Sequence, residues 1–320
     1  MRYLSGVQPS GVLHLGNYFG AIRQHIRSQD THECFYFIAD YHALTTVRDA
    51  DQLRANVRET AQAYLALGLD PEKVAFFRQS DVPQVTELSW VLSTLTPMGL
   101  LNRCHSYKDK TAKGLEASHG LFAYPVLMAA DILIYDSNKV PVGKDQIQHV
   151  EVTRDIAQKF NHEYGETLVI PDYEVEDSHA VVPGIDGEKM SKSYDNTLEM
   201  FQTPKKLKKK IGRIVTDSKG VEEPKDPEGN TIYLLYKLVA SEEEQNEMAE
   251  RFRKGGYGYG DAKKELHRRI LEYFEPYRDR YEELAANPKI VDEILEAGGE
   301  NARKTACATL NRVYEACGIR

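Results

Sequence analysis

Short apolar runs alternate with amphipathic stretches through the first half of this 320-residue chain. The apolar runs lack polar alternation, which is typical of strands that are covered on both faces. Between them, apolar residues recur every three or four positions, as on one face of a helix. This order predicts α/β structure with a Rossmann-like, doubly wound parallel sheet. The predicted strands are residues 3–7, 34–39, 74–77 and 140–143, and the predicted helices are 16–28 and 51–67.

The pattern changes near residue 180, where a segment rich in Gly, Pro and Lys leads into mainly helical sequence. Apolar spacing predicts a helix from Asp261, which Pro276 should kink or divide, and another helix after Gly298 and Gly299. We therefore expect two domains. A Rossmann-like domain covers 1–182, and a smaller helical domain covers 183–320, with its last helix packed back on the first domain.

The charge and composition of the chain exclude several classes of protein. The chain has 41 Lys and Arg against 49 Asp and Glu, a net charge of −8, which argues against a protein coated in positive charge. It leaves room for one basic patch, and residues 203–213 carry six basic side chains and no acid. No apolar stretch has the length of a membrane span, and the start has no signal-peptide core, so we expect neither a membrane nor a secreted protein. Four scattered cysteines predict no metal site.

A glycine-containing motif follows the first predicted strand. It reads Pro-Ser-Gly-Val-Leu-His-Leu-Gly-Asn over residues 9–17. Backbone N–H groups at such a helix start can hold phosphate. The ring of His14 and the amide of Asn17 can donate to phosphate oxygens, and Gly16 leaves room for a flat base. An ordinary strand-to-helix turn is the alternative, because short glycine motifs are common.

A second motif, Lys-Met-Ser-Lys-Ser, occupies residues 189–193. Lys189 and Lys192, flanked by hydroxyls, can neutralise a triphosphate as its charge moves during reaction. A solvated surface loop is the alternative for such a segment taken alone. Its combination with the first motif favours nucleotide chemistry.

These two motifs resemble the signatures of class I aminoacyl-tRNA synthetases. Residues 5–11, 124–133 and 140–149 are similar to bacterial tryptophanyl-tRNA synthetases, and matches extend over nearly the whole chain. The resemblance implies a tryptophan–tRNA ligase, which uses ATP to form tryptophanyl-adenylate and pyrophosphate and then charges the 3′ end of tRNA(Trp). It also implies Mg²⁺ on the triphosphate, a cytoplasmic homodimer, and a tRNA (anticodon)-binding role for 183–320.

The amino-acid site combines residue chemistry with this resemblance. Pro125 suits the first position of a helix, on which Met128 and Asp131 share a face. A thioether beside a carboxylate suits an indole with one N–H donor, although a phenol could also donate to Asp131. The apolar residues around this carboxylate predict that it has a polar partner. The resemblance implies a tryptophan site made of Asp131, Met128, Tyr124, Gln146, His42, Gln8 and Leu4.

The resemblance also assigns the ATP site. Lys189 and Lys192 are predicted to stabilise the leaving pyrophosphate, while His14 and Asn17 orient the phosphates. Lys110 would add a third positive charge, although loop lysines are usually only solvated. The implied ATP-binding residues are Gln8, Pro9, Ser10, Gly16, Asn17, Lys110, Gly143, Lys144, Asp145, Val182, Lys189, Met190, Ser191, Lys192 and Ser193.

Three alternative functions stay open at this point. A tyrosyl-tRNA synthetase would use the same fold and motifs, and a small-molecule nucleotidyltransferase would share the first motif. A catalytically silent relative that only binds RNA is the third. For tRNA, we expect phosphate contacts along residues 203–213, for which a solvated helix face is the alternative, and anticodon contacts along 263–280.

Overall fold

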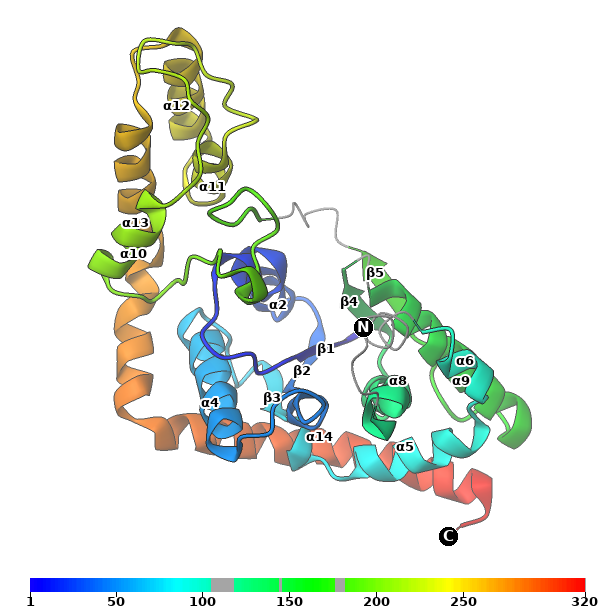
Figure 1. The fold of residues 1–320 in the computed structure, drawn as a ribbon. Coiled ribbons are helices and arrows are strands. Elements are labelled where there is room, and N and C mark those ends of the chain that lie inside the picture. The colour runs from blue at the N-terminus through cyan, green and yellow to red at the C-terminus, as the bar shows by residue number, and fades with distance from the viewer. Residues whose placement is uncertain (105–117, 144–145, 176–181, 320) are drawn as a thin grey trace.

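Five parallel strands form one sheet in the order β3-β2-β1-β4-β5 (Figure 1). This computed structural model describes residues 1–104, 118–143, 146–175 and 182–319. The predicted parallel α/β fold is confirmed, and four strands match predicted runs. The polar strand β5 was missed, because it lies at an edge and pairs only with β4 in the described sheet. The strands are β1 (Arg2–Val7), β2 (Glu33–Ile38), β3 (Val74–Arg78), β4 (Lys139–Val142) and β5 (Asp172–Val175).

Helices cover both faces of the sheet, which explains the unbroken apolar strands. Along β2, Tyr36 and Ile38 join one buried cluster with Tyr64, whereas Phe35 and Phe37 join a second cluster on the opposite face. None of the described helices is long and apolar enough to cross a membrane. The helices are α1 (Leu15–Asn17), α2 (Arg23–Ser28), α3 (Asp40–Ala43), α4 (Ala50–Ala66), α5 (Gln84–Leu95), α6 (Met98–Leu101), α8 (His119–Leu133), α9 (Ile147–Tyr164), α10 (Pro204–Gly212), α11 (Thr231–Val239), α12 (Glu242–Lys254), α13 (Tyr259–Ala286) and α14 (Pro288–Cys317), with shorter turns η1 (Tyr18–Ile22, a π-helix), η2 (Gln79–Asp81) and η4 (Lys192–Tyr194).

Helix α14 crosses the edge strand β3 at very short range. A Cβ atom added to Gly298 would lie 2.0 Å from the carbonyl oxygen of Phe76, and one added to Gly299 would lie 2.7 Å from Cβ of Asp81. The prediction that a helix starts after this glycine pair is therefore wrong, because α14 runs straight through it. Both glycines serve the close approach, and α14 covers an edge that would otherwise offer unpaired backbone groups. The domain boundary at 182/183 stays a prediction.

Two prolines lie inside helices, so Pro276 does not divide its helix and Pro125 does not begin one, contrary to prediction, while a kink at Pro276 stays a prediction. Helix α13 continues through Pro276, since residues of its buried face hold the helix on both sides of the proline: Phe274 before it and Leu284 after it. Helix α8 begins at His119 rather than at Pro125, with the Ser118 hydroxyl accepting a hydrogen bond at its N-terminus. The spacing of Met128 and Asp131 is unaffected.

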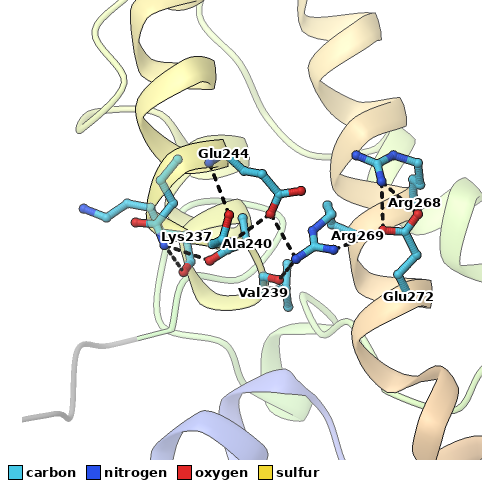
Figure 2. A network of polar contacts seen from close by, with 9 residues as sticks. Lys237, Val239, Ala240, Glu244, Arg268, Arg269 and Glu272 are labelled. Carbon is cyan, nitrogen blue, oxygen red and sulfur yellow. Dashed lines mark hydrogen bonds and ion pairs between the residues drawn. The ribbon is translucent and has the colours of Figure 1, made fainter.

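Arg269 ties three helices of the C-terminal half together (Figure 2). Its guanidinium donates to the carbonyl of Val239 at the end of α11 (2.9 Å) and contacts Glu244 in the first turn of α12 (3.0 Å). It also pairs with Glu272 on its own helix, α13 (3.1 Å), and Glu272 in turn accepts from Arg268. One half-buried cation thus fixes the mutual arrangement of α11, α12 and α13.

The contact between α14 and β3 predicts a stability effect. Gly298→Ala should lower the free energy of unfolding by about 1–3 kcal/mol, because the added methyl meets backbone atoms that cannot move aside cheaply. Urea denaturation measures this change. Gly260→Ala is the control: it lies in the first turn of α13 with nothing within 4 Å of an added Cβ, and should be neutral or stabilising. A Gly298→Ala protein as stable as the wild type would contradict the packing argument.

Candidate active site

The two sequence motifs meet in space although they are far apart in the chain. The Lys192 ammonium donates to the carbonyl oxygen of Ser10 (2.6 Å). A Cβ atom on Gly16 would lie 2.9 Å from Nδ1 of His14 and 3.4 Å from Cβ of Met190, so the glycine makes room for the His14 ring beside the second motif. Burial lowers the pKa of the Lys192 ammonium, and the carboxylate charges of Glu199 and Glu59 oppose this shift. Both motifs therefore form one surface.

His14 lies within this surface and is only 7% exposed. Burial lowers its pKa to about 4, and the nearby Lys192 charge adds to the shift, so the ring is neutral around pH 7. Its Nδ1 has no hydrogen-bond partner among the residues that the structure describes. The side-chain oxygen of Asn17 accepts the His14 backbone N–H (3.0 Å). The amide NH₂ of Asn17 is then the group left to act as a donor.

Asn196 organises the loop that carries the second motif. Its side-chain oxygen accepts the backbone N–H of Ser191 (2.7 Å), while its NH₂ group donates to Asp186 (2.9 and 3.1 Å) and to the Lys189 carbonyl (3.1 Å). Gly184 makes room for it, since a Cβ there would lie 2.3 Å from the amide. Nothing in the sequence marks Asn196 as special, because its role depends on contacts that exist only once the loop is folded.

A cavity of about 520 Å³ opens beside the first motif. It lies between the carboxyl ends of β1 and β4 and the helix α8, a usual position for a ligand in such sheets. Its size is that of a pocket for a small organic molecule. All seven residues predicted for the tryptophan site line it: Leu4, Gln8, His42, Tyr124, Met128, Asp131 and Gln146.

Asp131 is the buried charge of this cavity, with only 1% of its surface exposed. His42 Nε2 lies 2.8 Å from one carboxylate oxygen, and the side-chain NH₂ of Gln79 donates to both oxygens (2.8 and 2.9 Å). Burial raises the pKa of Asp131, and these two contacts oppose the rise. The polar partner expected for Asp131 is therefore present, and it consists of two residues, His42 and Gln79.

Gln79 and His149 were missed by the sequence analysis. Gln79 directly follows β3 at the carboxyl edge of the sheet, the same placement that singled out His42 after β2. His149 lies on α9 and lines the cavity, and its Nε2 lies 2.6 Å from the hydroxyl of Tyr124. The placement after a strand could have revealed Gln79, and His149 is the last residue of the segment 140–149 on which the family resemblance rests.

The other predicted ATP-binding residues divide between the two regions. The carbonyl of Val182 accepts the N–H of Met190 (2.9 Å), and the Ser191 hydroxyl accepts that of Ser193 (3.3 Å), so these belong to the second motif. Gly143 lines the cavity, and the buried Pro9 lies between Gln8 and Ser10. The structure describes no positions for the remaining three, Lys110, Lys144 and Asp145, which lie outside the described residues.

Comparison with known proteins places this geometry in a class. The family described as tRNA synthetases class I (W and Y) matches residues 1–275, and the chain belongs to this family. Within it, the chain is 55% identical to a tryptophan–tRNA ligase of Rhodopirellula baltica over 320 residues, which covers all of both chains. The chain is thus a member of the tryptophanyl-tRNA synthetases.

Solved structures agree with this placement. The crystal structure of tryptophanyl-tRNA synthetase from Campylobacter jejuni, complexed with ADP and tryptophan, superposes with a TM-score of 0.95 at 53% identity, covering 99% of this chain and 100% of that one. A tyrosyl-tRNA synthetase from Archaeoglobus fulgidus has a TM-score of 0.66 at 20% identity, which reflects the shared fold alone.

The hydrogen bonds of Asn196 predict a change in the local opening of its loop. Asn196→Asp would place a second carboxylate beside Asp186 and remove the donor to the Lys189 carbonyl. Losing a buried hydrogen bond costs about 1–3 kcal/mol, so we expect trypsin to cleave after Lys189 and Lys192 about tenfold faster or more.

Asn161→Asp is the matched control for this measurement. Asn161 is also buried, and its side-chain oxygen accepts two backbone N–H groups, those of Thr167 and Leu168, in a turn after α9. Cleavage at the two lysines should stay at the wild-type rate in this control. Equal acceleration in both variants would mean that Asn196 supports overall stability rather than the loop.

Proposed function

We propose that this chain is a tryptophan–tRNA ligase whose cavity holds L-tryptophan and whose two motifs together hold ATP. One observation carries the assignment of sites: the cavity that contains Asp131 opens beside the surface on which the two motifs meet. Gln8 links them, because it lines the cavity while its carbonyl accepts the N–H of Ser10 (2.8 Å). The amino acid and the nucleotide can therefore bind side by side.

The indole ring would lie in the apolar part of the cavity, against Leu4 and Met128. Its N–H would donate to Asp131, which is held ready by His42 and Gln79. Phenylalanine offers no donor and would leave this carboxylate without its substrate partner. Sites built on such a hydrogen bond reject analogues that lack it by about 10⁴-fold or more.

Adenylate formation requires an in-line displacement at the α-phosphorus of ATP. A carboxylate oxygen of tryptophan forms the new P–O bond as the bond to pyrophosphate breaks, and the leaving group carries away its electron pair. Lys189 and Lys192 stabilise the charge on pyrophosphate, and neutral His14 and Asn17 donate to phosphate oxygens. The 2′-hydroxyl of the terminal tRNA adenosine then attacks the acyl carbon and releases AMP.

Mg²⁺ would enter with the nucleotide. Among the described residues, no group of three or more His, Cys, Asp or Glu side chains is arranged to hold a metal ion. The donor set therefore fits an ion carried by phosphate and water oxygens, as is usual for Mg²⁺ with nucleotides. Its chemistry is to neutralise phosphate charge, in parallel with the two lysines.

The tRNA would bind along α10 and α13. Leu207 and Ile211 anchor α10, and its exposed side carries Lys205, Lys206, Lys208 and Lys209, a strip suited to phosphates. Lys210 belongs less to this strip, because it pairs with Glu199 (2.5 Å). We assign contacts with the anticodon end of the tRNA to residues 263–280 of α13. Two basic residues of this segment, Arg268 and Arg269, also form ion pairs with carboxylates of the chain itself (Figure 2).

A homodimer in the cytoplasm would complete the proposal. Trp90 on α5 is 73% exposed and Met98 at the start of α6 is 65% exposed. A second copy that covers these large apolar side chains would account for their exposure. Charged tRNA is consumed by protein synthesis, which sets the cytoplasm as the place of action.

ATP–pyrophosphate exchange tests the function and the role of Lys192. With tryptophan present, the wild type should exchange, and Lys192→Ala should reduce the rate about 100-fold or more, the usual effect of removing one stabilising donor from such a transition state. Lys208→Ala is the control: it should exchange at the wild-type rate, while its KM for tRNA in aminoacylation should rise and depend less steeply on salt than that of the wild type.

The same assay separates the alternatives. Exchange that depends on tyrosine would identify a tyrosyl enzyme, and exchange without any amino acid would indicate a nucleotidyltransferase. Absence of all exchange would indicate an RNA-binding relative without catalysis. An unchanged rate in Lys192→Ala would remove this lysine from the mechanism.

A further inference from the structure

Gln79 lies behind Asp131, outside the cavity wall, and is 1% exposed. Its side-chain oxygen faces two backbone donors at the start of α3, the N–H groups of Tyr41 (3.1 Å) and His42 (3.4 Å). Because an oxygen must face these donors, the orientation of the carboxamide is determined. Its NH₂ group therefore points at Asp131 and donates to both carboxylate oxygens.

We propose that Gln79 is a positioning residue, which holds Asp131 so that the carboxylate selects an aromatic substrate with an N–H donor. The inference rests on the proposed tryptophan site and adds a determinant of its specificity. Gln79 does not touch the substrate. It acts through Asp131, and it links that carboxylate on α8 to the backbone of His42 on α3.

The hydrogen-bond capacity of Asp131 supports this role. A carboxylate has about four lone-pair sites for hydrogen bonds. Gln79 occupies one site on each oxygen and His42 occupies another, so a single direction is left for a ligand. Without Gln79 the carboxyl group could rotate about its terminal bond, since such torsions are broad. The direction of the acceptor would then no longer be fixed.

The surroundings show why a neutral donor is needed at this position. His42 on α3 and Tyr135, which follows the end of α8, are titratable groups that interact electrostatically with Asp131. On the other side of Gln79, Asp40 accepts hydrogen bonds from Ser80, and Asp81 pairs with Arg78 (2.9 Å).

A carboxamide adds two hydrogen bonds to this acidic region and no charge. A carboxyl group of the same shape would share a proton with Asp131, and loss of that proton would place two negative charges in contact. The substitution Gln79→Glu therefore converts the positioning contact into one that depends on pH.

The test compares Gln79→Glu and Gln79→Met with the wild type in tryptophan-dependent exchange and in direct tryptophan binding, from pH 6 to 9. At low pH, the protonated pair in Gln79→Glu can replace N–H···O with O–H···O, so KM for tryptophan should be within about threefold of the wild type. As the pH rises, its KM relative to the wild type should increase about tenfold or more. Gln79→Met should raise KM about tenfold at every pH, with kcat changed less than KM.

Gln62 provides matched controls. It is also a buried glutamine, and it donates from α4 to the carbonyl of Tyr281 (2.8 Å), whose side chain packs in a different cluster from the apolar neighbours of Asp131, Ala130 and Ile132. Gln62→Glu and Gln62→Met should leave KM for tryptophan at its wild-type value across the pH range. Any general effect of a glutamine substitution in the core is thereby separated from the effect on the site.

Two results would overturn the inference. One is a KM ratio for Gln79→Glu that does not change with pH, and the other is a Gln79→Met protein whose KM lies within about twofold of the wild type. Gln79→Met tests the proposal even where Gln79→Glu fails to fold above neutral pH. Absence of tryptophan-dependent exchange in the wild type would instead refute the proposed function itself.

Discussion

Parallel strand pairing is the constraint on which this molecule depends. Because all strands run in one direction, the segments that follow β1, β2, β3 and β4 emerge at the same edge of the sheet. The first motif, His42, Gln79 and Gly143 come from four separate places in the sequence and meet there for this reason. The same pairing requires helical connections on both faces, which bury the strands and exclude water from the base of the cavity.

A buried carboxylate is the most demanding group in this arrangement. Asp131 brings charge into a region lined by apolar strands, and such a group is stable only when hydrogen-bonded. The Asp131 carboxylate accepts hydrogen bonds from donors on two different elements, His42 on α3 and Gln79 on η2. The result is an acceptor of fixed direction close to the apolar side chains of Leu4 and Met128, which suits recognition of one N–H on a flat ring.

The parts of the site that follow from local sequence order could be predicted. The motifs around His14 and Lys192, and the spacing of Met128 from Asp131, depend only on neighbouring residues. Gln79 and Asn196 could not be predicted as readily, because each acts through side-chain contacts with residues that other segments supply. Gly298 illustrates the same limit: a glycine that ends a helix and one that admits a strand backbone look alike in the sequence.

The contact between α14 and β3 also determines the order in which parts of the fold can form during synthesis. The chain is synthesised from its N-terminus, so the strand that contains Phe76 emerges from the ribosome long before Gly298 does. Until α14 arrives, β3 has one open side, and the nascent protein must keep that side from pairing with other chains. The outer edge of β3 can therefore be covered only after Gly298 has been synthesised, so this contact between distant parts of the sequence forms late.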